Sequence, residues 1–167
     1  MSEPRYGIWV PVGGNFGPLD TPDEPIDASY ERTRSLVLEA ERLGYVTTLV
    51  AQHLANPRSL DLEQLETWTA CAALAEATES IEIIAAIKPL LFHPAVLAKM
   101  ALGIDAISGG RFAINLISAW FRPEMVISLF LPMMNVIAIL VNGCRLLEIC
   151  GAVREWTSRV NISKSKI

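Results

Sequence analysis

The chain has 167 residues, of which 51% are hydrophobic and 19% are charged, and its formal net charge is −4. That hydrophobic content excludes a disordered chain, and the acidic balance provides no basic surface for nucleic acid or for an anionic membrane. The three cysteines lack metal-ligand or redox spacing and the N-terminus lacks a signal-peptide pattern, so we expect reduced thiols, no metal site and a cytoplasmic location.

Four short apolar runs rich in β-forming residues alternate with three segments of helical periodicity. Parallel strands need helical crossovers of this kind, so the alternation predicts an α/β fold with a parallel sheet. The predicted strands are Tyr6–Val12, Val46–Ala51, Ile81–Ile87 and Arg111–Trp120, and the predicted helices are Ser29–Leu43, Glu63–Ala77 and the segment from Pro94 to the glycine pair at 109 and 110.

Two α/β architectures fit this order of elements. One is the first half, about four β/α units, of a TIM (β/α)8 barrel, and the other is a small doubly wound sheet. Helix lengths do not separate them. Neither Gly13–Gly14 nor Gly109–Gly110 belongs to a glycine-rich phosphate-binding pattern, so the glycines do not support a doubly wound nucleotide-binding domain.

The character of the sequence changes after Met125. Residues 126–141 (VISLFLPMMNVIAILV) carry no charge and show neither a strand period nor a helix period. This run is shorter than the roughly 20 apolar residues that a membrane-spanning helix needs, so membrane attachment is only a minor alternative. We therefore divide the chain into a body, residues 1–125, and an apolar and then basic tail, residues 126–167.

Residues at the C-terminal ends of the predicted strands are the candidates for function, because the loops there can vary over a rigid core in barrel enzymes. Gln52 and His53 end the second strand, where they either hydrogen-bond a ligand or form a polar pair satisfied by water or loop backbone. His53 is also a candidate general base, although spacing identifies no carboxylate partner for it. Trp9, 86–88 and 115–120 occupy the other strand ends.

Four stretches of the body, taken in order and spacing, resemble the bacterial-luciferase-like flavin-dependent monooxygenases, a family that includes alkanesulfonate, dimethyl sulfone and pyrimidine monooxygenases. The resemblance covers residues 6–125 and rests on YGIWVPV, LETWTACAALAEAT, AAIKPLLFHPAVLAKMALGIDAISGGRF and INLISAWFRPE. It implies a TIM barrel, of which this truncated chain would supply the first four strands. It also implies reduced FMN as the cofactor, O2 as a co-substrate, and a separate flavin reductase as a partner.

The resemblance also implies roles for individual residues. In the pyrimidine-oxidising members the strand end corresponding to Gln52 and His53 contributes to FMN binding. Asn115 matches a motif whose asparagine hydrogen-bonds the flavin ring, with Ser118 close by, and Glu124 matches an acidic residue that contacts FMN. The structural alternatives are a buried structural asparagine at Asn115 and a solvated helix-start glutamate at Glu124.

Other conspicuous residues are expected to be structural. His93, before Pro94, is expected to cap a helix rather than to act in catalysis. Cys71, Trp68 and Met100 are expected in the core, and the glycine pair at 109 and 110 is expected to form the left-handed turn that ends a helix.

The tail lacks the family pattern. Where the family carries a stretch close to His-Asp-Glu-Arg-Tyr-Arg-Tyr, this chain has MMNVIAIL at 133–140, and codons for these residues can encode the family stretch when read one base earlier. We therefore hypothesise that the chain from about Val126 is an out-of-frame translation. The gene sequence tests this, since its other reading frame should continue the barrel.

By resemblance, the expected function is oxygenation of a small organosulfur compound, an alkanesulfonate or sulfone, or a related compound, using reduced FMN and O2. The residues do not identify the substrate. Because the family holds the FMN phosphate largely with loops of the second half of the barrel, the truncated chain is expected to be inactive or nearly so. The alternative is a catalytically silent half-barrel that self-associates, with residues 126–141 as one contact.

Overall fold

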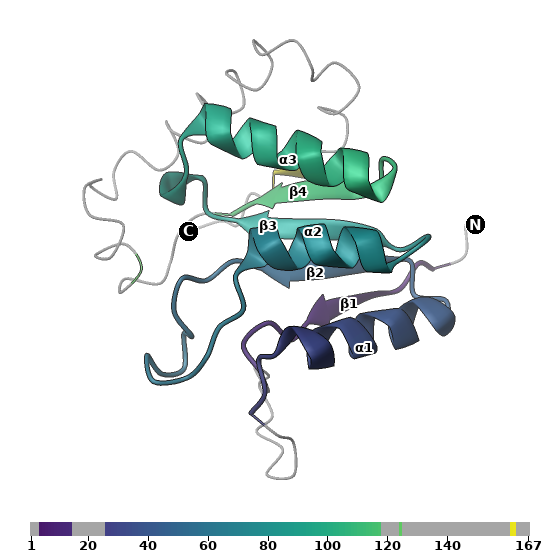
Figure 1. Ribbon diagram of the computed structural model, residues 1–167, viewed down its shortest axis with the longest axis horizontal. Coiled ribbons are helices and arrows are strands. Elements are labelled where there is room, and N and C mark those ends of the chain that lie inside the picture. Colours follow the sequence, from purple (N-terminus) through teal and green to yellow (C-terminus); the bar gives the residue numbers. More distant parts are fainter. Residues whose placement is uncertain (1–3, 15–25, 118–123, 125–160, 163–167) are drawn as a thin grey trace.

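A five-stranded parallel sheet in the order β1-β2-β3-β4-β5 forms the centre of the molecule (Figure 1). The computed structural model describes residues 4–14, 26–117, 124 and 161–162. The strands are β1 (Gly7–Val10), β2 (Thr47–Ala51), β3 (Glu82–Ile87), β4 (Phe112–Leu116) and β5 (Asn161–Ile162). The helices are α1 (Tyr30–Arg42), α2 (Thr67–Ala77) and α3 (Pro94–Ser108), and a 3-10 turn, η1 (Pro89–Leu91), precedes α3.

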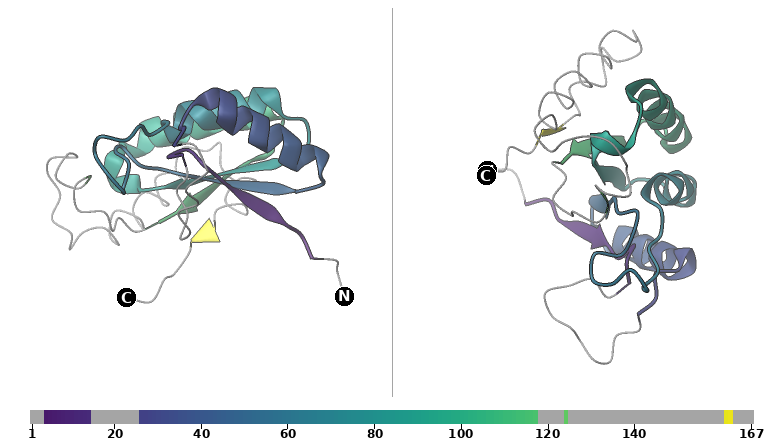
Figure 2. Two further views of the ribbon diagram at one scale, coloured as in Figure 1. Left: turned by 90° about the horizontal axis from the view of Figure 1, so that it is seen from below. Right: turned by 90° about the vertical axis from the view of Figure 1, so that its left-hand side faces the viewer.

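The three helices cover one face of the sheet (Figure 2). Strands β1 to β4 follow one another in sequence order, so successive right-handed crossovers place every helix on the same side. A doubly wound sheet reverses its strand order at one point and carries helices on both faces. The described part of the chain therefore has the barrel-type arrangement rather than the doubly wound one.

Side chains that cap the helices explain where the helices begin and end. The Ser29 hydroxyl accepts the Arg32 N–H at the start of α1, and His93 Nδ1 accepts the Ala95 N–H at the start of α3, as predicted for His93. The start of α2, predicted at about Glu63, lies at Thr67: the Glu66 carboxylate accepts the N–H groups of residues 68 and 69, so the helix begins after it. Gly109 ends α3 in the left-handed conformation, with φ of 66°.

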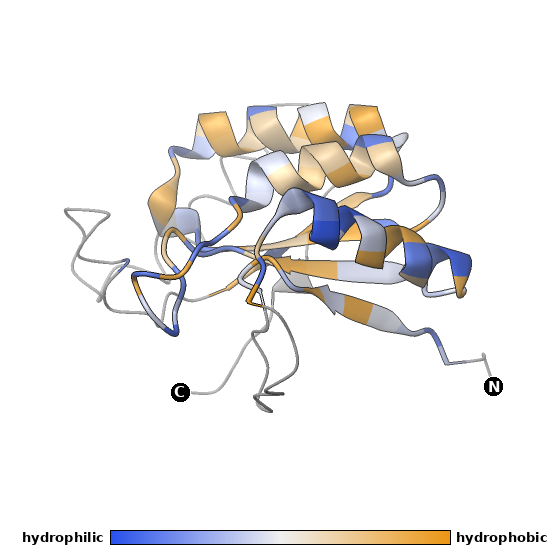
Figure 3. Ribbon diagram, turned by 60° about the horizontal axis from the view of Figure 1, so that its bottom comes forward, coloured by the Kyte–Doolittle hydropathy of each residue, from blue (hydrophilic) through white to orange (hydrophobic). Residues whose placement is uncertain are grey.

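The two faces of the sheet bury different side chains. The face toward the helices holds the main core, where Trp68 packs edge to face on Phe92 with ring centroids 5.7 Å apart. Cys71 is fully buried in the same core, as expected. In Figure 3, α1 is the most hydrophilic of the three helices.

The opposite face of the sheet is built in rows, because parallel strands in register align their side chains. Trp9, Leu49, Ile84 and Ala113 form one row. Ala51, Ala86 and Asn115 form the next row toward the C-terminal ends of the strands. Layers of this kind fill the interior of a TIM barrel.

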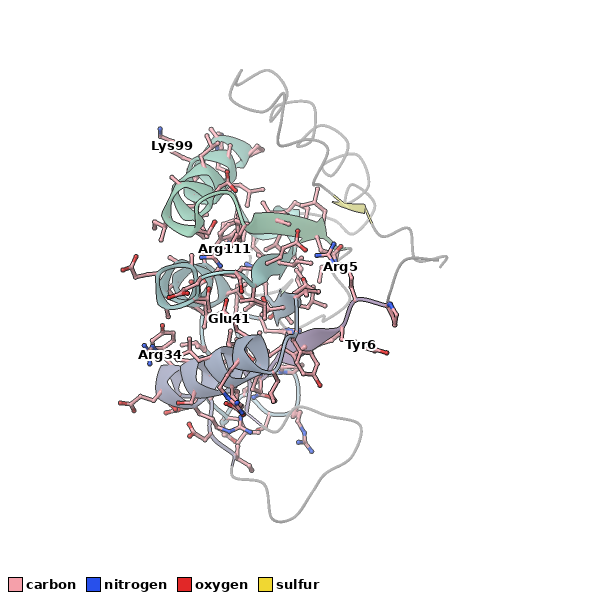
Figure 4. The ribbon with its side chains drawn as sticks, turned by 90° about the vertical axis from the view of Figure 1, so that its right-hand side faces the viewer. Arg5, Tyr6, Arg34, Glu41, Lys99 and Arg111 are labelled. Atoms are coloured by element: carbon pink, nitrogen blue, oxygen red, sulfur yellow. The ribbon has the colours of Figure 1, made fainter. Side chains whose placement is uncertain are left out.

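The connection between α2 and β3 is held by two charged side chains from other elements (Figure 4). Glu41, in α1, accepts the backbone N–H groups of Glu79, Ser80 and Ile81, the last two at 2.6 and 2.8 Å. Arg111, just before β4, donates to the carbonyl groups of residues 75, 78, 81 and 108 and to the hydroxyl of Thr78. This end of the sheet is thus fixed by hydrogen bonds as well as by core packing.

Most of the predicted tail, residues 126–167, lies outside the described residues, so the out-of-frame hypothesis stays a prediction. The described part of the tail is β5, which pairs in parallel with β4 at Asn115 and Leu116. The sequence did not predict this strand. In the described part of the chain, each helix is too short or too polar to cross a membrane.

Candidate flavin site

Four polar side chains meet where β2 and β3 end. Gln52 and His53 directly follow β2, and Lys88 directly follows β3. Glu124 joins them from beyond β4. All four side chains are buried, with relative exposures of 1% for Gln52, Lys88 and Glu124 and 8% for His53. We call these four residues the strand-end cluster.

Glu124 is the acceptor at the centre of the cluster. Its Oε1 accepts the backbone N–H of Leu54 at 2.6 Å and lies 3.1 Å from Nδ1 of His53. Its Oε2 accepts a hydrogen bond from the Lys88 ammonium. The structure thus supplies the carboxylate partner for His53 that spacing did not identify, and it shows that Glu124 is not a solvated helix-start residue.

Lys88 is the donor at the centre, and the sequence analysis assigned it no role. Besides Glu124, its Nζ donates to the carbonyl oxygen of Gln52 at 2.6 Å and lies 3.1 Å from Nδ1 of His53. One sequence signal could have identified it: a lysine ends an apolar strand, EIIAAI, directly before a proline. A lysine in that place needs a buried partner, because an unpaired buried ammonium is costly.

The charges of the cluster are mutually compensated. Burial alone would raise the pKa of Glu124, but the contacts with His53 and Lys88, the charge of Lys88 and the Leu54 N–H hold that pKa below its usual value. Burial lowers the pKa of Lys88, and the hydrogen bond and charge of Glu124 offset part of this effect. The two buried groups thus form a directly hydrogen-bonded acid–base pair at the strand ends.

Gln52 connects the two strand ends. Its side-chain Oε1 accepts the Lys88 backbone N–H at 2.8 Å, and its own backbone N–H donates to the Ala86 carbonyl at 2.9 Å. The amide Nε2 is buried and has no hydrogen-bond partner among the described residues. The amide oxygen of Gln52 thus bonds within the protein, whereas its NH2 group is a donor with no acceptor in the part of the chain that the structure describes.

Asn115 lies two strands away from Gln52, on β4. It is half-buried and stands in register with Ala86, in the row nearest the C-terminal strand ends. Its Oδ1 is buried and accepts no hydrogen bond within the described part of the chain. A buried acceptor without a partner is costly unless a ligand or water supplies the donor. Ser118, its predicted neighbour, lies outside the described residues.

A small pocket opens beside the cluster at the ends of β1 and β2. Its volume is about 70 Å³, and Trp9, Ala51 and His53 are among the residues that line it. Asn56 holds the surrounding loops together, because its Nδ2 donates to the carbonyl groups of Gly13 and Glu63, each at 3.0 Å. The imidazole of His53 therefore borders both the buried charge pair and a cavity.

A flavin fits the donors and acceptors that these residues provide. An isoalloxazine ring carries carbonyl oxygens and an N–H group at one edge. Within the part of the chain that the structure describes, the strand ends offer an acceptor without a partner at Asn115 and a donor without a partner at Gln52. Small side chains at Ala51 and Ala86 lie in register with Asn115. Such small residues leave room for a planar ring to approach the strands. Within the described residues, no group of His, Cys, Asp and Glu side chains could hold a metal ion.

Curated relatives match most of this chain. It is 33% identical over 123 residues to the pyrimidine monooxygenase RutA of Agrobacterium fabrum, an alignment that covers 72% of this chain and 34% of the relative. It is 35% identical over 123 residues to RutA of Variovorax paradoxus, with 72% and 33% covered. The chain thus spans about a third of the length of the curated relatives it matches.

Solved structures share the fold at low sequence identity. Monooxygenase RslO1 from Streptomyces bottropensis superposes with a TM-score of 0.64 at 22% identity, over 86% of this chain and 41% of that one. The oxygenating constituent of 3,6-diketocamphane monooxygenase from Pseudomonas putida, in complex with FMN, gives 0.67 at 16% identity, over 86% and 38%. An F420-dependent secondary alcohol dehydrogenase gives 0.71 at 13% identity, over 90% and 42%.

The family model described as luciferase-like monooxygenase matches residues 5–128, which include β1 to β4, α1 to α3 and the whole strand-end cluster. That range is well over half of the chain. The chain therefore belongs to the luciferase-like, flavin-dependent monooxygenase family.

Proposed function

We propose that the strand ends of this chain form part of an FMN site, in which the flavin contacts Asn115 together with Gln52, His53 and Glu124. The observation that carries this proposal is the buried Oδ1 of Asn115, which lacks a partner among the described residues. In the proposed complex this oxygen accepts an N–H of the flavin ring. Ser118 is proposed as a second contact, by resemblance.

The remaining residues position and enclose the ring. Glu124 and His53 form one side of the site. Gln52 offers a flavin oxygen its amide N–H, which has no acceptor among the described residues. Reduced FMN would supply the electrons with which O2 is activated. The part played by the protein is to hold the ring at the strand ends and to exclude water from it.

The proposed substrate is a small organic compound that is oxygenated with O2. The relatives named above are pyrimidine monooxygenases, so their names favour a pyrimidine ring, and the expected organosulfur substrate gains no support. A silent, self-associating half-barrel is not favoured, since the matched proteins are enzymes. A flavin reductase as the source of reduced FMN and a cytoplasmic location remain part of the proposal.

FMN titration of the purified chain, followed by quenching of flavin fluorescence, tests the cofactor site. Binding in the micromolar range, about 7 to 8 kcal/mol, is expected for the wild-type chain. Asn115→Leu keeps most of the side-chain volume and removes the acceptor, so it should weaken binding at least tenfold.

Glu76→Gln, an exposed change on α2, is the matched control and should leave FMN binding unchanged. The proposal is wrong if the wild-type chain does not quench FMN at about 1 mM, or if Asn115→Leu binds FMN as the wild-type chain does.

A further inference from the structure

The hydrogen bonds of Lys88 also bear on which ring nitrogen of His53 carries the proton. A lysine ammonium has three N–H donors, and three acceptors lie around Lys88 Nζ: Glu124 Oε2, the Gln52 carbonyl oxygen and His53 Nδ1. With a relative exposure of 1%, Lys88 has almost no access to water for any of these three bonds. Each donor therefore needs an acceptor from the protein.

Two neutral tautomers of His53 are compatible with the positions of the heavy atoms. If Nδ1 carries the proton, it donates to Glu124 Oε1, and the third donor of Lys88 then faces an N–H group without an acceptor. If Nδ1 carries no proton, it accepts from Lys88, and all three donors of the ammonium are satisfied. Glu124 Oε1 keeps the Leu54 N–H at 2.6 Å in either case.

The tautomer in which Nδ1 carries no proton is favoured, because the other tautomer leaves one Lys88 N–H donor without an acceptor. A buried charged donor without a partner costs more than a carboxylate oxygen that accepts one hydrogen bond instead of two. We propose that Lys88 is a positioning residue that fixes His53 as the tautomer with its proton on Nε2. A proton on Nε2 makes that nitrogen a hydrogen-bond donor, suited to a carbonyl or anionic oxygen, and not a general base.

The tautomer can be read in the full chain without any ligand. Long-range ¹⁵N–¹H correlation spectra distinguish ring nitrogens that carry a proton from those that do not, and the chain has only two histidines. His93 is an internal reference, because its Nδ1 accepts the Ala95 N–H and its proton must therefore be on Nε2. His93→Asn, which keeps a capping acceptor, assigns the signals.

In the wild-type chain, His53 should show the same pattern as His93, with Nδ1 unprotonated. A proton on Nδ1 of His53 would overturn the proposal. Lys88→Met removes the donor and keeps the length of the stem, so the proton of His53 should move to Nδ1, toward Glu124, while His93 stays unchanged. If the His53 signals in Lys88→Met match the wild type, the proposal is also overturned.

Should Lys88→Met fail to fold, the proposal still stands or falls on the spectrum of the wild-type chain. The wild-type spectrum decides the tautomer whatever the variants do.

The role of His53 toward a ligand rests on the proposed flavin site and is tested separately with FMN. Lys88→Met should weaken FMN binding at least tenfold under conditions where circular dichroism shows it to be folded. Binding equal to that of the wild type, together with a changed tautomer, would overturn the positioning role. If the wild-type chain binds no FMN, the proposed function fails, whereas the tautomer is still decided by the spectra.

Discussion

His53 and Glu124 are separated by 71 residues in the chain, yet the imidazole Nδ1 and the carboxylate Oε1 lie 3.1 Å apart. The C-terminal ends of parallel strands meet at one edge of a sheet, which brings residues from distant parts of the sequence together there. In this protein Lys88 contacts both residues, and it directly follows β3, the strand between β2 and β4 in the sheet. The strand-end cluster is therefore a product of the fold and not of any local motif.

Glu124→Gln is expected to lower the free energy of unfolding at pH 7 by about 3 kcal/mol, because it leaves the buried Lys88 ammonium without its anionic partner. Urea unfolding followed by circular dichroism measures this difference. Glu76→Gln, which neutralises an exposed carboxylate, should change the free energy by less than about 0.5 kcal/mol.

The same variant should alter the response to acid. The pKa of Glu124 in the folded chain lies below the unfolded value of 4.5, so the folded state binds fewer protons than the unfolded state as the pH falls past that value. The stabilisation from Glu124 is present above the unfolded pKa and is lost as the pH falls through the folded pKa. The difference in the free energy of unfolding between the wild type and Glu124→Gln should thus shrink in acid. A difference that stays constant from pH 7 down to about 3 would contradict this prediction.

The sequence predicted the strands and the helices, because these depend on local patterns, whereas the strand-end location of the site stays a prediction. Periodicity and the residues that break it place β1 to β4 and α1 to α3 to within a few residues. The α2 start was missed because Glu66 can continue a helix or cap one, and only the backbone geometry distinguishes these roles. Lys88 was a candidate by its position at a strand end, but its role was not predicted because its partners, Gln52 and Glu124, are each 36 residues away.

Arg111→Lys is expected to destabilise the fold by about 1 to 3 kcal/mol. The guanidinium of Arg111 donates to five acceptors: Ala75 O, Thr78 O, Thr78 Oγ1, Ile81 O and Ser108 O. A lysine ammonium has three donors and cannot reach all five together. Differential scanning calorimetry measures the fall in Tm.

Arg34→Lys is the matched control for this change, since Arg34 is exposed on α1 (Figure 4). The control should unfold at the wild-type temperature. An Arg111→Lys chain with wild-type Tm would show that the hydrogen bonds to the α2–β3 connection add little to stability.

Two glycine-to-alanine substitutions should have opposite effects. A Cβ at Gly7 would lie 2.5 Å from Thr47 Cγ2 and 2.9 Å from the Thr47 carbonyl oxygen, so Gly7→Ala should force β1 away from β2 and cost about 1 to 3 kcal/mol. A Cβ at Gly103, exposed in α3, meets nothing within 4 Å, so Gly103→Ala should stabilise the helix by about 0.5 to 1 kcal/mol.

Chemical denaturation of the two glycine variants in parallel measures the expected decrease in the free energy of unfolding for Gly7→Ala and the expected increase for Gly103→Ala. The double variant Gly7→Ala/Thr47→Ser loses the close Cγ2 contact but keeps the contact with the carbonyl oxygen. It should recover only part of the lost stability. Full recovery would mean that the backbone of β2 accommodates the new methyl group.

Cys71 should resist alkylation as long as the chain is folded. Burial raises the pKa of its thiol, with a smaller contribution from the charge of Glu66, so the reactive thiolate is scarce. The side chain is also fully buried in the core between α2 and the sheet, so a reagent reaches it only when that core opens. Iodoacetamide labelling read by peptide mass spectrometry should show Cys71 unmodified in native buffer. Its labelling rate should rise with urea in parallel with unfolding, and rapid labelling in native buffer would show that α2 opens without global unfolding.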